Sequence, residues 1–161
     1  VLGRPTSYYY ESPKLGSSGC TVKSCSEAIL NIGNPAIWWA FIPAIIVALL
    51  VLLLKRDWRF GALLVVFGAG YFPWFMYPTR TMFYFYALSF EPFLILLLAG
   101  VLGLVLSGAR GSVLRARLGV TLVAIYLVGV LVLSAYFMPL WTAQVIPYEQ
   151  WYSHMWFKSW I

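Results

Sequence analysis

Long uncharged stretches decide what this chain can fold into. Four runs, residues 35–54, 60–77, 81–106 and 118–140, are almost wholly apolar, and Glu91 is the one charged residue inside them. The hydrocarbon core of a bilayer needs about 20 apolar residues per helix. Strands of a membrane barrel alternate apolar and polar residues, whereas residues 45–54 do not. We therefore predict an all-α membrane protein in which each run is a transmembrane helix.

The composition excludes an ordinary soluble domain. The chain is 62% hydrophobic and 10% charged, whereas soluble domains average about 45–50% and about 25%. The net charge of +6 raises the question of a nucleic-acid partner. However, six of the eleven Lys and Arg residues lie in two short segments, 55–59 and 110–117, that separate apolar runs. We therefore expect membrane lipid as a partner, and no nucleic acid.

The same basic residues predict the orientation. Lys and Arg in short loops favour the cytoplasmic side of the membrane. Segments 55–59 and 110–117 each carry three basic residues, whereas the intervening loop at 78–80 carries only Arg80. We therefore predict a multi-pass protein of the cell membrane whose segments 1–34 and 141–161 both lie outside the cytoplasm.

The two flanking segments have different compositions. In the polar segment 1–34, Ser24 and Glu27 have the spacing of a capping box, which predicts a short helix at residues 28–32. The tail 141–161 is rich in tryptophan and too short to span, so we expect it to fold along the outer leaflet or onto the protein. The sequence opens at Val1 without a signal peptide, and we expect a longer protein whose start is missing here.

Cys20 and Cys25 lie in the predicted extracytoplasmic segment. Oxidising compartments favour disulfides, so we expect a bond between them, the alternative being two free thiols. A zinc site needs more ligands than these, and His154, the one histidine, lies at the far end of the chain. We therefore assign no metal site.

Arg80 is the first candidate binding residue. It stands among aromatic residues at the predicted outer end of the third helix. Arginine binds phosphate through two parallel hydrogen bonds, which suits an anionic ligand at the membrane surface. The alternative is an arginine that only contacts lipid headgroups.

Glu91 is the second candidate. A carboxylate inside a membrane helix is costly and usually faces the protein interior. In a continuous helix, Arg80, Tyr84, Leu88 and Glu91 share one face, so these side chains form a polar stripe lining a cavity. The alternative is a structural Glu91 bonded to a neighbouring helix, for example to Tyr126 or Ser134.

Two further sets of residues invite a functional interpretation. Tyr8, Tyr9 and Tyr10 form an aromatic cluster that either contacts a sugar or an acceptor peptide or anchors the chain at the membrane surface. His154 with Glu149 has the chemistry for acid–base work, although a single histidine in an aromatic tail is more often structural. No complete catalytic set is present in the sequence.

Several motifs resemble one family. Residues 4–10 (RPTSYYY), the Cys20 and Cys25 pair and residues 33–39 (GNPAIWW) are similar to the entry into the C-terminal membrane region of bacterial protein O-mannosyltransferases. Residues 71–74 (YFPW), 80–86 (RTMFYFY) and 154–161 (HMWFKSWI) continue the resemblance. It covers essentially the whole chain in order, and the actinobacterial type is the most similar.

The resemblance implies a function. Members of this family are polytopic glycosyltransferases of the GT-C architecture, which transfer mannose from polyprenyl-phosphate-mannose to Ser or Thr of exported proteins on the outer face. The family's acidic catalytic pair lies in the first outer loop, which this chain lacks, so no residue here is assigned as catalytic and the fragment alone is expected to be inactive. Arg80 and Tyr84 become candidates for binding the donor phosphate, and Glu91 a candidate for lining the cavity.

The resemblance also implies partners: the lipid-linked donor, the exported acceptor protein and the N-terminal part of the same enzyme. No cofactor is assigned, and a role for a divalent metal stays open. The alternative is a non-catalytic membrane scaffold or subunit, which predicts no polar stripe at the outer end of the third helix. A transporter fragment is a third possibility, but it expects polar residues on several facing helices.

Overall fold

The chain folds into two compact units, residues 1–35 with 130–161 and residues 36–129. The structure is a computed structural model that describes residues 6–16, 19–77, 84–108 and 112–160. Each unit has its own buried cluster of apolar side chains, and each is described by itself below.

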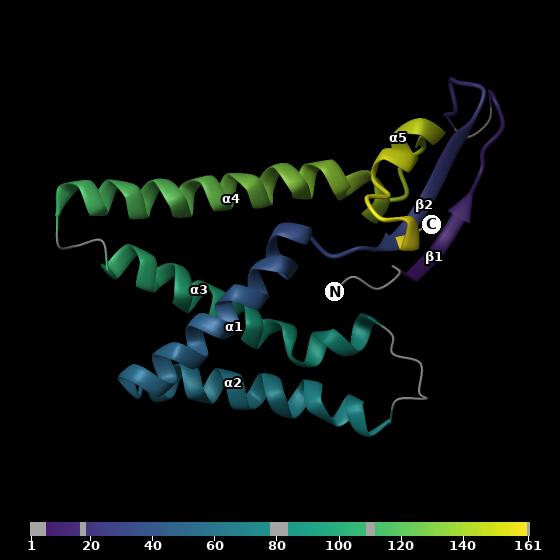
Figure 1. Cartoon of the computed structure of the whole chain (residues 1–161). Coiled ribbons are helices and arrows are strands. Elements are labelled where there is room, and N and C mark those ends of the chain that lie inside the picture. Colours follow the sequence, from purple (N-terminus) through teal and green to yellow (C-terminus); the bar gives the residue numbers. More distant parts are fainter. Residues whose placement is uncertain (1–5, 17–18, 78–83, 109–111, 161) are drawn as a thin grey trace. The chain divides into compact units, whose positions relative to one another are not determined.

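Four helices in the described residues are long and apolar enough to cross a membrane, which confirms the predicted number. They are α1 (Pro35–Lys55), α2 (Trp58–Tyr71) with its 3₁₀ extension η1 (Phe72–Met76), α3 (Glu91–Gly108) and α4 (Val113–Trp141) (Figure 1). The first turns of α4 include Arg115 and Arg117, which the sequence placed in a loop. The change from α to 3₁₀ geometry after Tyr71 coincides with Pro73, which cannot donate a backbone hydrogen bond.

The turn between α1 and α2 is tight and polar. Lys55 ends α1, and Arg56 adopts a positive φ of 52°. Asp57 then caps α2, and its carboxylate accepts a hydrogen bond of 3.0 Å from the backbone N–H of Arg59. An N-cap of this type is worth about 1 kcal/mol of helix stability. The basic cluster in this turn is therefore compatible with a well-formed helix start.

One face of α1 forms the centre of the second unit. Phe41, Ala44, Ala48 and Val51 are buried at helical spacing. They pack in one cluster with Phe60 of α2 and with Phe90 and the buried leucines of α3, which are Leu94, Leu97 and Leu98. The α2 and α3 helices run alongside each other (Figure 1). Gly100 of α3 allows this approach, because a Cβ atom there would lie 3.2 Å from the Cε1 atom of Phe60.

The predicted helix at 81–106 is wrong in its first part. Residues Tyr84–Ser89 form a separate 3₁₀ helix, η2, and α3 begins at Glu91. Pro92 explains this boundary, because proline has no N–H with which to continue a helix that arrives from the residues before it. It is accommodated in the first turn of a helix, where no intrahelical donor is needed.

The first unit contains a small sheet with strand order β1-β2-β3, and the helix predicted at 28–32 is wrong. β1 (Thr6–Glu11) pairs antiparallel with β2 (Cys25–Asn31), and β2 pairs with the short β3 (Ile146–Pro147). The burial of this segment alternates as in a strand: Ser26, Ala28 and Leu30 are buried, whereas Glu27, Ile29 and Asn31 are more exposed. Cys20 and Cys25 form a disulfide with an S–S distance of 2.04 Å beside the start of β2.

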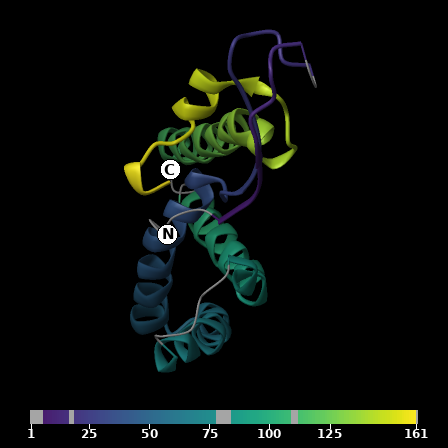
Figure 2. The ribbon, with the colours of Figure 1, turned by 90° about the vertical axis from the view of Figure 1, so that its right-hand side faces the viewer.

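The tail folds onto the protein. After α4 the chain forms β3, then α5 (Tyr148–Ser153) and a final 3₁₀ turn, η4 (Lys158–Trp160) (Figure 2). Trp151, Met155 and Trp160 are buried in one cluster with residues of β2 and the end of α4. Of the two predicted arrangements for the tail, the structure therefore shows packing against the chain itself.

Two polar side chains attach the residues after β2 to α4 within this unit. The Asn34 amide donates hydrogen bonds to the carbonyl of Val130 at 2.9 Å and to the hydroxyl of Ser134 at 2.8 Å. The indole of Trp141 donates to the carbonyl of Ile32 at 2.7 Å. These bonds place the sheet at the C-terminal end of α4.

Candidate functional site

Two 3₁₀ turns frame the segment that carries Arg80. η1 ends at Met76, and η2 begins at Tyr84. Arg80 itself lies outside the described residues, as does the side chain of Tyr84. The structure therefore describes the residues on the two sides of this segment, which belong to η1 and η2.

The frame is held by a direct aromatic contact. Trp74 of η1 and Tyr86 of η2 have ring centroids 4.5 Å apart. This contact brings the two turns together at one end of the α2 and α3 pair. Sequence reasoning missed it, although the two aromatic residues on either side of Arg80 were a visible signal. The described residues on the two sides of segment 78–83 are thus held close to each other by Trp74 and Tyr86.

A second aromatic cluster lies beneath the two turns. Phe67 and Tyr71 of α2 stack with centroids 5.4 Å apart, and Phe90 meets both rings edge-on at 5.7 Å. Gly70 makes this contact possible, because a Cβ atom there would lie 3.0 Å from the Cβ atom of Phe90. The cluster fixes the start of α3 against α2.

Glu91 occupies the first turn of α3 and is partly buried. The predicted stripe through Tyr84, Leu88 and Glu91 does not form on one α-helical face, because residues 84–89 are 3₁₀ and precede α3. A carboxylate in the first turn interacts favourably with the helix dipole, which explains why an acidic residue is tolerated at this position. Because α3 begins at Glu91, the positive end of its helix dipole lies at Glu91.

The suggested partners of Glu91 are engaged elsewhere. The hydroxyl of Tyr126 donates to the carbonyl of Ala36 at 3.3 Å. The hydroxyl of Ser134 accepts from Asn34. The place of Glu91 in the first turn of α3 explains an acidic residue there, and a bond between Glu91 and Ser134, which lies in the other unit, stays a prediction.

His154 is buried and packs against aromatic side chains. Its side chain is 1% exposed, and it stacks on Tyr136 with ring centroids 4.2 Å apart. Nδ1 lies 2.6 Å from the carbonyl oxygen of Gln150, and Nε2 lies 2.8 Å from the carbonyl oxygen of Tyr136. This geometry supports the structural interpretation of His154 and leaves no free nitrogen for acid–base work with Glu149.

The three tyrosines of β1 have different surroundings. The hydroxyl of Tyr9 donates to the carboxylate of Glu11 at 2.5 Å, and this bond raises the pKa of Tyr9 to about 12. Tyr8 and Tyr10 are 57% and 47% exposed. The ring of Tyr10 contacts that of Trp151 with centroids 5.5 Å apart. Tyr8 and Tyr10 therefore present aromatic surface on the sheet.

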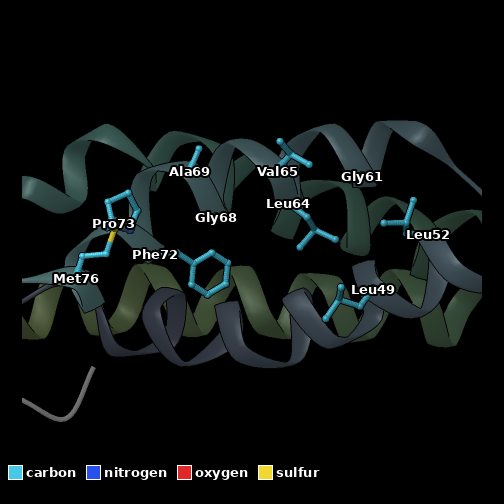
Figure 3. A pocket seen from close by; sticks show the side chains of 10 residues that line it. All are labelled: Leu49, Leu52, Gly61, Leu64, Val65, Gly68, Ala69, Phe72, Pro73 and Met76. Carbon is cyan, nitrogen blue, oxygen red and sulfur yellow. The ribbon is translucent and has the colours of Figure 1, made fainter.

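A groove of about 660 Å³ lies between α1 and α2 (Figure 3). Its walls include Leu49 and Leu52 of α1 and Leu64, Val65 and Ala69 of α2. All its lining side chains are apolar, so the groove accommodates hydrocarbon and supplies no acid, base or nucleophile. Among the described residues, no group of three His, Cys, Asp or Glu side chains is placed to hold a metal ion.

Comparison with known proteins gives similar sequences in three actinobacteria. A polyprenol-phosphate-mannose–protein mannosyltransferase of Mycolicibacterium smegmatis is 35% identical over 157 residues, which are 98% of this chain and 30% of that protein. The protein of the same name in Mycobacterium tuberculosis is 33% identical over the same shares. The one in Corynebacterium glutamicum is 34% identical over 160 residues, 99% of this chain and 30% of that protein.

The chain thus spans about a third of the length of the curated relatives it matches. No protein-family model matches it. No solved structure matches it either.

Proposed function

Since this chain belongs to the family of polyprenol-phosphate-mannose–protein mannosyltransferases, we propose that it forms the C-terminal membrane part of such an enzyme. The whole enzyme transfers mannose from a polyprenyl-phosphate carrier to serine or threonine hydroxyls of exported proteins. The observation that carries the proposal is the similarity to three such proteins over 98–99% of the chain. A scaffold of unrelated origin would not share its sequence over that length.

The reaction fixes what each group has to do. The acceptor hydroxyl oxygen attacks the anomeric carbon of mannose and loses its proton to a base. The bond between that carbon and the phosphate oxygen breaks, and polyprenyl phosphate leaves with the bonding electrons. The base is assigned to no residue of this chain, so it belongs to the rest of the enzyme.

The role proposed for this chain is to bind the donor. Segment 78–83 contains Arg80, and the Trp74–Tyr86 contact brings the described residues that flank this segment together near the end of α2 and the start of α3. A guanidinium there interacts with the carrier phosphate, which gains charge as mannose departs. Tyr84 at the start of η2 is proposed as a second contact of the same phosphate.

The proposed location is the cell membrane, with both flanking segments outside the cytoplasm. The basic residues of the α1–α2 turn and of the first turns of α4 then face the cytoplasm. The Arg80 loop lies at the opposite membrane surface, where a carrier phosphate resides among lipid headgroups. The apolar groove between α1 and α2 faces hydrocarbon in this arrangement.

The test is mannosyl transfer by the complete protein. It is purified in detergent, supplied with polyprenyl-phosphate-mannose labelled in the sugar, and given a peptide that contains one threonine. We expect labelled peptide, and none when threonine is replaced by alanine. A complete protein that transfers no mannose to any peptide or exported protein would refute the proposal and favour the scaffold alternative.

A further inference from the structure

β1 is an edge strand with one side unpaired in the described part of the chain. The sheet order is β1-β2-β3, and every pairing of β1 is with β2. On the other side of an edge strand, alternate residues leave N–H and C=O groups without a partner. Such an edge is a template for one more strand.

Of the devices that protect edge strands, β1 has an irregular register between Ser7 and Tyr9 and an acidic end residue, but neither lysine nor proline. Lysines and prolines are common devices against unwanted pairing, but β1 reads Thr-Ser-Tyr-Tyr-Tyr-Glu. Its pairing with β2 is irregular between Ser7 and Tyr9, and regular from Tyr9 to Glu11. The Glu11 carboxylate is occupied by the hydroxyl of Tyr9. Backbone groups in the regular stretch thus remain accessible along a short length of extended chain.

The exposed tyrosines of this strand are held in place. The hydroxyl of Tyr10 lies 3.3 Å from that of Ser26, and its ring leans on Trp151. The hydroxyl of Tyr8 accepts from the amide of Asn31 at 3.4 Å. Rigid, exposed and amphipathic tyrosine rings are typical of surfaces that bind polypeptide, because they lose little conformational entropy on binding.

We propose that the acceptor polypeptide docks as an added strand along the free edge of β1, between the rings of Tyr8 and Tyr10. This inference rests on the proposed function, since the relatives are named as acting on protein. Backbone hydrogen bonds recognise an extended chain regardless of its side chains. An enzyme that modifies many different proteins before they fold needs recognition of this kind, and the tyrosines supply contact area for small apolar residues around the acceptor hydroxyl.

Strand addition predicts a period of two in the acceptor. Two threonine peptides are compared, each with the same number of N-methyl groups, placed at odd or at even distances from the threonine. Because alternate N–H groups of an added strand face β1, one peptide should show a KM raised about tenfold, as expected for one lost bond of typical worth. The other should stay near the unmethylated value, and the KM for the donor should not change for either. Equal effects of the two methylation patterns would overturn the inference.

The tyrosines are tested in the complete protein. Tyr10→Ala should raise the KM for the peptide and leave the KM for the donor unchanged. Tyr152→Ala is the matched control, because Tyr152 is a similarly exposed tyrosine of the same unit that lies on α5. An unchanged KM for the peptide in Tyr10→Ala, or the same rise in both variants, would contradict the proposal.

A photo-crosslinker separates binding from catalysis. Tyr8→p-benzoylphenylalanine in the complete protein should crosslink to a labelled threonine peptide, and excess unlabelled peptide should compete. A crosslink to the upstream part of the same protein would show that the edge is already covered, and would refute the inference. Crosslinking to the peptide without any mannosyl transfer would refute the proposed function while supporting the docking surface. Transfer with neither crosslink nor methylation pattern would refute the docking surface alone.

Discussion

At the scale of single residues, Arg80 is the side chain whose chemistry matters most to the proposed reaction. The carrier phosphate gains negative charge as its bond to mannose breaks. A cation at that point therefore stabilises the transition state more than the ground state, which is the condition for catalysis. The planar guanidinium adds two parallel hydrogen bonds to this electrostatic effect.

Replacing Arg80 should therefore lower turnover. In the complete enzyme, Arg80→Ala is expected to reduce kcat about 100-fold or more, as for one lost donor at a developing anion. Arg80→Lys should recover only part of the rate, because its single ammonium lacks the fork geometry. The measurement is kcat with labelled donor at saturating peptide, with expression and the thermal unfolding midpoint as checks on folding. Near wild-type turnover in Arg80→Ala would reduce this residue to a headgroup contact.

His154 should act on stability. His154→Phe keeps an aromatic ring beside Tyr136 but removes the two ring nitrogens that lie within hydrogen-bond distance of the carbonyls of Gln150 and Tyr136 at a buried position. A loss of about 1–3 kcal/mol is expected. The measurement is protease resistance of the C-terminal segment in the complete protein, which should fall. Tyr152→Phe on the exposed side of α5 is the control and should change little.

The sequence predicted the disulfide correctly but misplaced Glu91 within its helix. The disulfide between Cys20 and Cys25 follows from the predicted oxidising compartment, and the structure contains the bond. Glu91 was read as an intramembrane carboxylate because the run from 81 to 106 looked continuous. The helix starts at Glu91, so its position is that of an acidic first-turn residue. Sequence spacing alone does not show where a helix begins inside an apolar run, and Pro92 was the signal that had to decide it.

At the scale of elements, helix contact in the second unit depends on glycines that differ in what faces them. A Cβ atom on Gly70 would lie 3.0 Å from the Cβ atom of Phe90, which cannot move without its backbone. A Cβ atom on Gly61 of the same helix would lie 3.0 Å from the Cδ1 atom of Leu52, the end of a flexible side chain. An added Cβ atom would therefore be tolerated at Gly61 but not at Gly70, although the two contact distances are the same.

This difference makes a matched pair of variants. Gly70→Ala should destabilise the complete protein by about 1–3 kcal/mol, because the start of α3 has to shift away from α2. Gly61→Ala should be neutral or slightly stabilising, since Leu52 can rotate and alanine favours helix by up to about 1 kcal/mol. Thermal unfolding midpoints in detergent measure both. If Gly70→Ala unfolds at or above the wild-type midpoint, the close approach of α2 to Phe90 does not hold.

The elements also show why local signals misled. The four apolar runs were sufficient for four membrane helices, since lipid leaves the backbone few alternatives. The segment before them has such an alternative, because β1 and β3 offer partners to β2. A capping-box pattern at Ser24 and Glu27 is a local preference, and the burial of Ser26, Ala28 and Leu30 against the tail overrides it. Those partners are distant in sequence, which is why the pattern alone missed the sheet.

At the scale of the whole molecule, the arrangement of charge is the feature that connects sequence to function. Basic residues gather at Lys55 and Arg56 between α1 and α2, and at Arg115 and Arg117 in the first turns of α4. The α2–α3 connection has only Arg80. The proposed transfer to exported proteins, with Arg80 at the donor phosphate, needs this second connection on the outer face, and the charge pattern predicts the same orientation.

The chemical accessibility of single introduced cysteines tests the predicted orientation of the chain in the membrane. In the complete protein, with any upstream cysteines replaced, Thr79→Cys should react with a membrane-impermeant maleimide in intact cells. Ser112→Cys, which directly precedes α4, should react only after the membrane is opened. Cys20 and Cys25 are disulfide-bonded and almost wholly buried, so they add no background to the labelling. Labelling of Ser112→Cys but not Thr79→Cys in intact cells would invert the topology, place Arg80 on the cytoplasmic face and remove the donor-binding role proposed for it.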